Sequence, residues 1–239
     1  EFGISHQPGK IILETQGVAK AYGKKKVLSN VNLEIERGEK IAFVGQNGQG
    51  KSTLAKIIVS EIDYEGNVKI GHNVQLGYFA QNQSTYLEGN QTVLESAEDS
   101  ATAENRTKVR DLLGAFLFPG DAVEKKVKVL SGGERNRLAL CKLLLQPFNV
   151  LIMDEPTNHL DIASKSVLKE ALLKFKGTLI LVSHDRDFIQ GLCEKVIAFR
   201  DKEVRPFLGD INAYLEDKKL NSLKELEKRT IEKVKFQNK

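Results

Sequence analysis

A glycine-rich segment between an apolar stretch and a helix-like stretch has the composition of a phosphate site. Gly45–Ser52 follows Ile41–Val44, and Thr53 continues into a run of helical character. Glycines let a loop wrap a phosphate with backbone N–H groups, and the N-terminus of the next helix attracts the same anion. In such loops the lysine binds the β- and γ-phosphates and the serine hydroxyl binds Mg²⁺. The alternative is a Gly-rich turn that matches this pattern by accident. If the loop binds a nucleotide, the expected contacts are Gly45, Asn47, Gly48, Gly50, Lys51, Ser52 and Thr53.

Two adjacent carboxylates follow a second apolar stretch. Asn149–Met153 leads into Asp154 and Glu155, and open α/β sheets bind ligands at the carboxyl edge of their strands. Asp154 suits the Mg²⁺ shell, as the Walker-B aspartate does. Glu155 takes a different partner because neighbouring residues on a strand alternate in direction, so it is placed to orient and deprotonate the attacking water. Alone, the segment could equally be a strand that ends in an acidic turn before Pro156.

Two further polar residues follow predicted strands at the same edge. His184 comes directly after Thr178–Val182 and Ser183, and Gln81 follows Leu76–Ala80. An isolated histidine of this kind is more often a satisfied, half-buried residue. Beside a phosphate site it is predicted to contact the γ-phosphate, and Gln81 is a candidate ligand of Mg²⁺ or of the water.

A fourth motif opens a helix. Leu130-Ser131-Gly132-Gly133-Glu134 precedes a continuous helix-like run up to Leu145. Ser131 is a good N-cap, and two glycines let a phosphate approach the start of the helix closely. Taken alone, the motif is a plain helix cap.

The elements that must position these residues fall into three groups. Ile11–Glu14 and Val27–Ile35 read as antiparallel strands joined by a turn near Tyr22–Lys25. After Gly38, apolar strands alternate with helices, which predicts a parallel sheet covered by helices. A mostly helical subdomain is expected at about 91–146. The strand and helix pairs are Ile41–Val44 with Lys51–Val59, Val150–Met153 with Ile162–Leu173, and Leu179–Val182 with Arg186–Cys193.

Composition excludes some classes of protein. The 239 residues are 41% hydrophobic, enough for a core, and contain no run of about 18 apolar residues. Cys141 and Cys193 lie far apart in apolar surroundings, which favours core residues in a reducing, cytoplasmic compartment. The formal net charge of the chain is +4, and most of this excess lies in residues 215–239, which carry eight Lys/Arg against five Asp/Glu. This charged helical tail is interpreted as a solvated face, with nucleic-acid contact as the minority reading.

The start of the chain carries no targeting pattern. The only methionine is Met153, so Glu1 is interpreted as a position inside a longer protein, and residues 1–9 as a linker or cloning scar.

The motifs together identify a family. From about residue 10 to 214 the chain resembles an ABC ATPase domain, with its phosphate loop, signature (Leu130–Glu134), Asp154-Glu155 and His184 in the family's order. The resemblance implies an α/β fold with a phosphate-loop NTPase core, an N-terminal antiparallel β-subdomain and an inserted helical subdomain. It also implies ATP and Mg²⁺ as cofactors, and head-to-tail pairing in which the signature residues bind the γ-phosphate of a second ABC domain. Those signature residues are Ser131, Gly132 and Gly133; Asp161 would cross the interface and Tyr22 would stack on adenine.

Within the family the chain looks most like the second, C-terminal domain of an F-type (ABC-F) ATPase. The resemblance includes Glu134, Glu155–Asp161, Gly77–Gln81 and Leu117-Phe118. It implies MgATP hydrolysis coupled to action on the ribosome, without membrane insertion. The alternatives are the motor domain of a membrane transporter and an ATP-sensing scaffold that does not hydrolyse; Glu155 weighs against the scaffold.

Overall fold

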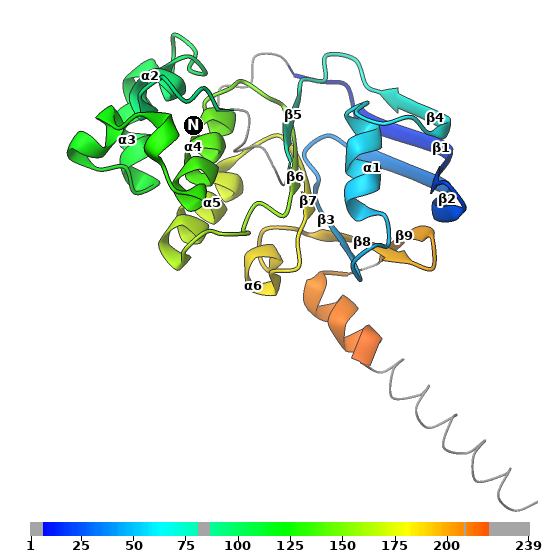
Figure 1. Ribbon diagram of the computed structural model, residues 1–239. Helices are drawn as coiled ribbons and strands as arrows, with labels where there is room; N and C mark the ends of the chain where they lie inside the picture. Colours follow the sequence, from blue (N-terminus) through cyan, green and yellow to red (C-terminus); the bar gives the residue numbers. More distant parts are fainter. Residues whose placement is uncertain (1–6, 81–86, 208, 220–239) are drawn as a thin grey trace, which may run out of the picture.

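The N-terminal part of the chain forms an antiparallel sheet. A computed structural model describes residues 7–80, 87–207 and 209–219. Strands β1 (Ile11–Tyr22), β2 (Lys25–Glu36) and β4 (Glu65–Ile70) pair in the order β2-β1-β4 (Figure 1). Both predicted strands are present, but β1 extends to Tyr22 and the hairpin turn is only Gly23-Lys24. Strand β4, which sequence reasoning missed, returns to this sheet after the first helix.

The second sheet holds the strands predicted to be parallel. Its order is β5-β6-β7-β3-β8-β9, and only the last pairing is antiparallel. Apolar residues fill the three central strands on both faces, as a sheet covered on both sides requires. The strands are β3 (Lys40–Gly45), β5 (Leu76–Phe79), β6 (Val150–Asp154), β7 (Thr178–Val182), β8 (Lys195–Arg200) and β9 (Glu203–Phe207).

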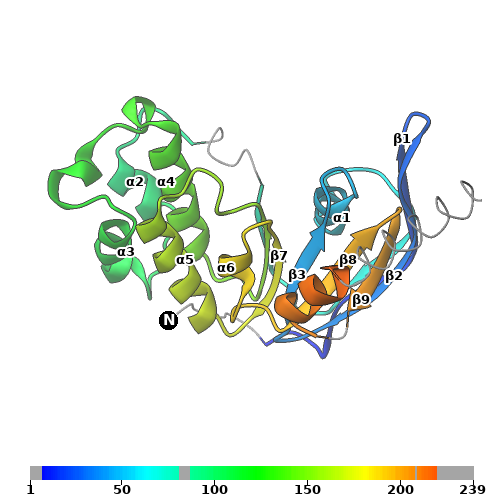
Figure 2. The same cartoon turned by 90° about the horizontal axis from the view of Figure 1, so that it is seen from below.

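Helices cover both faces of this sheet. Helix α1 lies between the two sheets, and the remaining helices lie on the far side of the six-stranded sheet (Figures 1 and 2). Residues 211–219 form a further helix beside β8 and β9. Helix α6 ends at Ile189, four residues before the predicted end. The helices are α1 (Lys51–Ile58), α2 (Val93–Glu98), α3 (Val109–Ala115), α4 (Gly132–Leu144), α5 (Ile162–Lys174) and α6 (Arg186–Ile189).

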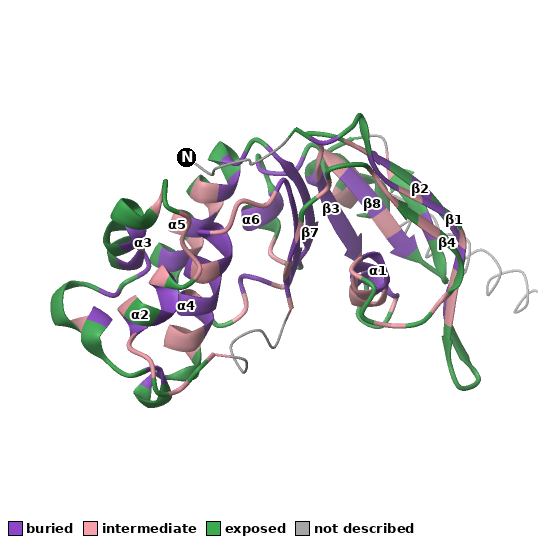
Figure 3. Cartoon of the chain, turned by 90° about the horizontal axis from the view of Figure 1, so that it is seen from above, coloured by how far each residue is buried: buried purple, intermediate pink, exposed green. Residues whose placement is uncertain are grey.

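The core has two layers, one on each face of the six-stranded sheet. On β3, Ile41 and Phe43 pack with α1 and the three-stranded sheet, whereas Ala42 and Val44 pack with α4, α5 and the helical subdomain. The alternation follows from the two-residue period of a strand. Figure 3 shows the buried strands running between the two layers.

The inserted helical subdomain lies between β5 and β6 in sequence. Thr92 begins α2 with a capping box, because its hydroxyl accepts from Glu95 N while the Glu95 carboxylate accepts from Thr92 N. Short 3₁₀ turns connect α2, α3 and α4. The structure thus confirms the predicted α/β fold with its antiparallel and helical subdomains. Within the described ranges, no helix combines the length and the apolarity needed to cross a membrane.

Candidate functional site

The glycine-rich loop joins the end of β3 to the start of α1. Gly45 pairs with Phe199 on β8 and has a φ of +154°. A Cβ on Gly45 would lie 2.4 Å from the Phe199 carbonyl oxygen, a contact with backbone that cannot move cheaply. The loop can therefore pass along β8 only with glycine here.

Lys51 is folded back into this loop. Its Nζ donates to the carbonyl oxygens of Gly45 at 2.9 Å and Gln46 at 3.0 Å, and the residue is 6% exposed. Burial lowers the pKa of Lys51, while the nearby carboxylates of Glu155 and Asp154 act to raise it. The loop thus surrounds a cation whose bonds to carbonyl oxygens are available for exchange with an anionic ligand.

Ser52 and Asp154 come together from α1 and β6. Ser52 Oγ donates to Asp154 Oδ1 at 3.0 Å, and Asp154 is buried at the carboxyl end of its strand. Burial raises the pKa of Asp154, although the bond from Ser52 acts in the opposite direction. A hydroxyl and a carboxylate are the oxygen ligands that Mg²⁺ prefers beside a phosphate group. The donor set therefore fits the predicted metal; Gln81, its third predicted ligand, lies outside the described residues.

Glu155 lies next to His184. Its backbone N–H donates to Val182 O at 2.8 Å, its φ is +52°, and its Oε1 is 3.5 Å from His184 Nε2. Burial raises the pKa of Glu155 and lowers that of His184, whose pKa is also lowered by Lys51. Burial thus disfavours the charged form of both groups, so their contact is weaker than a full ion pair and leaves both available to a water or phosphate.

The predicted signature residues lie at the start of α4. Ser131 Oγ accepts from Glu134 N, and the Glu134 carboxylate accepts from Ser131 N at 2.8 Å. Glu134 also lies 3.6 Å from the Lys125 ammonium. This capping box gives the glutamate in the motif a structural role. A Cβ on Gly132 would meet no described atom within 4 Å, so packing within the described chain does not explain that glycine.

The segment after Glu155 is bound to α4. Asp161 caps α5 by accepting from Ser164 N at 2.8 Å and lies 3.3 Å from Arg137 Nη1. Asn136 Nδ2 donates to Asn158 O at 3.0 Å. These contacts fix Asp161 at the surface between the signature helix and α5.

Tyr22 lies at the end of β1, with about half of its surface exposed and the Lys20 ammonium 5.3 Å from its ring centroid. A Cβ on Gly50 would lie 2.6 Å from Leu28 Cδ2, so the β2 segment after the hairpin packs against the phosphate loop. The Tyr22 ring is thus an exposed aromatic surface on the hairpin whose second strand contacts that loop.

The structure therefore gathers Lys51, Ser52, Asp154, Glu155 and His184 at one edge of the six-stranded sheet. The signature start on α4 lies on the opposite side of the sheet from α1 (Figures 1 and 2). Sequence reasoning missed Arg137, Lys165 and Asp185. Asp185 was detectable as the N-cap of the helix after His184, whereas the partners of the two cations depend on the tertiary fold.

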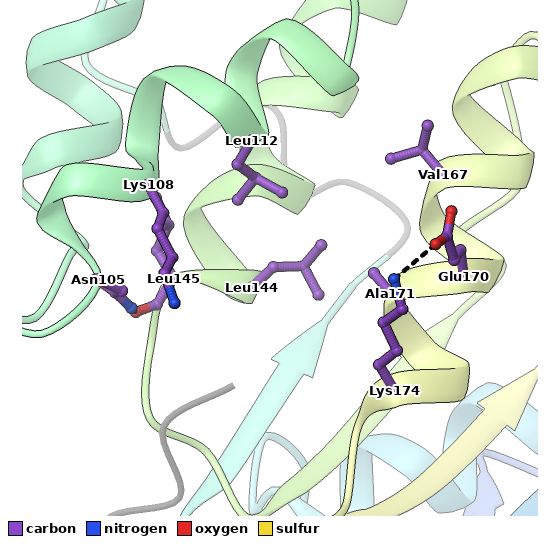
Figure 4. Close-up of a pocket in the computed structure, with 9 residues that line it drawn as sticks. All are labelled: Asn105, Lys108, Leu112, Leu144, Leu145, Val167, Glu170, Ala171 and Lys174. Carbon is purple, nitrogen blue, oxygen red and sulfur yellow. Dashed lines mark hydrogen bonds and ion pairs between the residues drawn. The ribbon is translucent and has the colours of Figure 1, made fainter. Parts of the chain in front are cut away.

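Two hollows lie outside this cluster. One of about 650 Å³ adjoins the phosphate loop at Gly45, Gln46 and Gln49 and continues along β8, β9 and helix 211–219. The other, of about 270 Å³, lies between α3 and α5 around Leu112, Leu144 and Val167 (Figure 4). None of the predicted site residues that the structure describes lines the second hollow.

The strand, glycine loop and helix with Lys51, together with the carboxylates at the end of β6, two strands away in the same sheet, define a phosphate-loop NTPase. A family model described as ABC transporter matches residues 28–158, and the chain belongs to this family. It is an ABC ATPase domain.

Relatives place it close to the F family. It is 43% identical over 222 residues to ABC transporter F family member 5 of Arabidopsis thaliana, covering 92% of this chain and 32% of the relative. It is 42% identical over 219 residues to Putative ATP-binding protein YdiF of Bacillus subtilis (strain 168), covering 91% of this chain and 34% of the relative. The chain thus spans about a third of the length of these curated relatives.

A solved structure shares the fold. The chain matches the ATP-binding cassette MJ0796, solved as a dimer in a post-hydrolysis state bound to ADP and Pi, with a TM-score of 0.69 and 26% identity. The match covers 82% of this chain and 98% of that one.

Proposed function

We propose that this domain binds MgATP on its phosphate loop and hydrolyses it only when paired with a second ABC domain, whose signature segment completes this site while Ser131, Gly132 and Gly133 complete the site of the second domain. The observation that carries the proposal is the position of α4: its N-terminus lies across the sheet from α1, and Gly132 has open space around it. A glycine that its own fold does not need is explained by the close approach of an outside phosphate. The dimeric state of MJ0796 supports the pairing.

The contacts of the described residues support the following proposed roles. Lys51 exchanges its carbonyl partners for the β- and γ-phosphates, and Ser52 and Asp154 hold Mg²⁺, with Gln81 as a further ligand. When bound, the metal neutralises charge on the phosphates. Glu155 orients and deprotonates the water, and its raised pKa suits a general base.

The remaining predicted residues hold the nucleotide and the interface. His184 contacts the γ-phosphate as a neutral imidazole, Tyr22 stacks on adenine, and Asp161 faces the second domain. Gly45, Asn47, Gly48, Gly50 and Thr53 supply backbone N–H groups to the phosphates.

At the level of the whole protein, we propose that ATP-driven closure and hydrolysis-driven release act on the ribosome. The support is the similarity to F-family members and the ribosomal role that the resemblance implies. The second ABC domain would lie in the same parent chain, with this domain as the C-terminal one, or in a second copy of this chain.

Glu155→Gln tests the chemistry. The variant keeps the shape of the side chain but loses the base, so we expect ATP binding, a persistent closed dimer and loss of phosphate release. Light scattering gives the mass, and a phosphate assay gives the rate. The matched control is Glu170→Gln on the surface of α5, which should behave as wild type. An ATP-loaded Glu155→Gln that stays monomeric and hydrolyses normally would refute the assigned role.

The ribosomal role is tested with the full-length parent. With hydrolysis blocked, it should cosediment with ribosomes. Cosedimentation with membranes would favour the motor domain of a transporter, and ATP binding without phosphate release by the wild-type parent would favour a sensing scaffold.

A further inference from the structure

An ion pair outside the predicted site joins α5 to the turn that carries His184. Lys165, on the first turn of α5, donates from Nζ to Asp185 Oδ2 at 2.7 Å. The Lys165 side chain is 36% exposed and that of Asp185 is 22% exposed. A pair screened from water to this extent holds its geometry better than a fully exposed one.

Asp185 organises the turn on both sides of itself. Its Oδ1 accepts from Phe188 N at 3.1 Å, which caps α6, and its own N–H donates to Ser183 Oγ at 3.1 Å. His184 lies between the two residues of the second bond. The carboxylate of Asp185 therefore connects the end of β7, the His184 turn and the start of α6.

The other end of the pair is firmly held. Asp161 caps α5 through Ser164, whose N–H and hydroxyl both donate to its carboxylate, at 2.8 and 3.1 Å. Ser164 is fully buried, and Lys165 N donates to Asp161 O at 3.0 Å. Arg137 from α4 lies against the same Asp161 carboxylate. Lys165 thus projects from a helix start that α4 also holds.

Charges around Asp185 favour its ionised form. Burial alone raises the pKa of Asp185, but the bonds from Lys165 and Phe188 N, with Lys169 nearby, leave the pKa below its usual value. Lys169 itself donates to Asp187 O. Asp185 is also close enough to Glu155 to interact with its carboxylate, which contacts the adjacent His184. Without Lys165, Asp185 would lose the side-chain partner that fixes its orientation.

We propose that Lys165 is a positioning residue for hydrolysis: through Asp185 it holds the His184 turn so that the imidazole stays against Glu155. The proposal rests on the proposed function of this site. The side-chain hydrogen bond of Lys165 leads to Asp185 and not to the phosphate loop. Its loss should therefore lower kcat much more than it weakens ATP binding, because His184 is one of several proposed phosphate contacts and Lys51 with its loop is not part of the network.

The test compares three variants of this chain and of its full-length parent. Lys165→Met keeps the aliphatic stem and removes the charge, Lys165→Arg keeps the charge, and Lys174→Met removes a cation from the last turn of the same helix, where it pairs with exposed Glu170. For Lys165→Met we expect kcat to fall on the order of 10- to 100-fold, the range that follows from misplacing a catalytic group by about an ångström. KM and the Kd for ATP should change much less than kcat. Lys165→Arg should recover most of kcat, and Lys174→Met should match wild type.

Asp185→Asn tests the same ion pair from its other partner. Asparagine still caps α6 but loses the charge that Lys165 pairs with, so the double variant Lys165→Met/Asp185→Asn should be no slower than the slower single variant. Urea unfolding of each variant shows whether it is folded; if Lys165→Met is not, Asp185→Asn alone should still lower kcat much more than it raises the Kd for ATP.

Glu155→Gln is measured in parallel to separate the two proposals. If Glu155→Gln abolishes hydrolysis but Lys165→Met hydrolyses at the wild-type rate, the positioning role is overturned and the proposed function stands. A kcat loss in Lys165→Met that Lys165→Arg does not restore, or equal losses in Lys174→Met, also overturns it. Normal hydrolysis by Glu155→Gln overturns the function of the site itself.

Discussion

Replacing Gly45 by alanine should destabilise the domain through one identifiable contact. The new Cβ would lie 2.4 Å from Phe199 O and 3.0 Å from Phe199 Cβ, with φ at +154°. A backbone conformation that side chains rarely adopt costs about 1–3 kcal/mol, and forcing an extra methyl into a packed site costs about 1–3 kcal/mol more. We expect the free energy of unfolding to fall by about 2–6 kcal/mol, a large part of the roughly 5–15 kcal/mol of a typical domain.

Gly48→Ala is the matched control because it lies in the same loop. Its φ is +79°, but a Cβ there would meet no described atom within 4 Å. It therefore carries only the cost of a left-handed conformation, about 1–2 kcal/mol, partly offset by a less flexible unfolded chain. Urea unfolding measures both, with the slope m as a check that the same transition is compared. Equal losses within about 0.5 kcal/mol, near the limit of such comparisons, would refute the contact with Phe199 as the cause.

Three further outcomes follow from caps and buried groups. Ser131→Ala should lower the free energy of unfolding by about 1 kcal/mol, the usual cost of a lost N-cap, whereas Ser131→Thr should not; equal urea midpoints would contradict the capping box. Because the folded pKa of Asp185 lies below its unfolded value of about 3.9, its stabilisation is present above that pH and is lost as pH falls through the folded pKa. Asp185→Asn should therefore flatten the acid side of a Tm-against-pH curve, and an unchanged slope would count against the pairing with Lys165. Burial raises the pKa of Cys193 to about 12 and raises that of Cys141 further, so iodoacetamide at pH 8 should label neither thiol until urea unfolds the chain; labelling of the folded protein would show that the thiols are accessible.

Much of the catalytic edge was predictable because its residues lie close together in sequence and at strand ends. Gly45–Ser52 and Asp154-Glu155 each follow an apolar stretch, and a parallel sheet brings such strand ends to one edge. Strand β4 was missed because Glu65, Gly66 and Asn67 are poor strand formers and only its pairing with β1 makes it a strand. Strand β8 has an apolar centre, whereas β9 contains Glu203 and Pro206, which disfavour a strand. The membership of both strands in the second sheet depends on the tertiary fold.

The supporting contacts could not be predicted for a different reason. Arg137 and Asp161 are separated by 24 residues and Lys165 and Asp185 by 20, and a charged residue on a helix has many partners that its sequence allows. Only the packing of α4 against α5, and of α5 beside the His184 turn, selects one. The role of a motif residue can be predicted from its residue type and its position in the motif. The role of a supporting residue such as Lys165 depends on which residue the fold places beside it.

The six-stranded sheet separates two hydrophobic clusters, and this separation matters for engineering the domain. Helix α1 packs in one layer of the core and the helical subdomain in the other, so among the described residues Leu113 and Phe116 belong to a different hydrophobic cluster from Leu54 and Ile57. Libraries that remodel the helical layer can therefore vary its outer surface while leaving the nucleotide-binding layer intact. The two layers of the domain thus have separate cores on opposite faces of one sheet. Substitutions on the surface of the helical layer can change what it recognises without altering the packing around the phosphate loop.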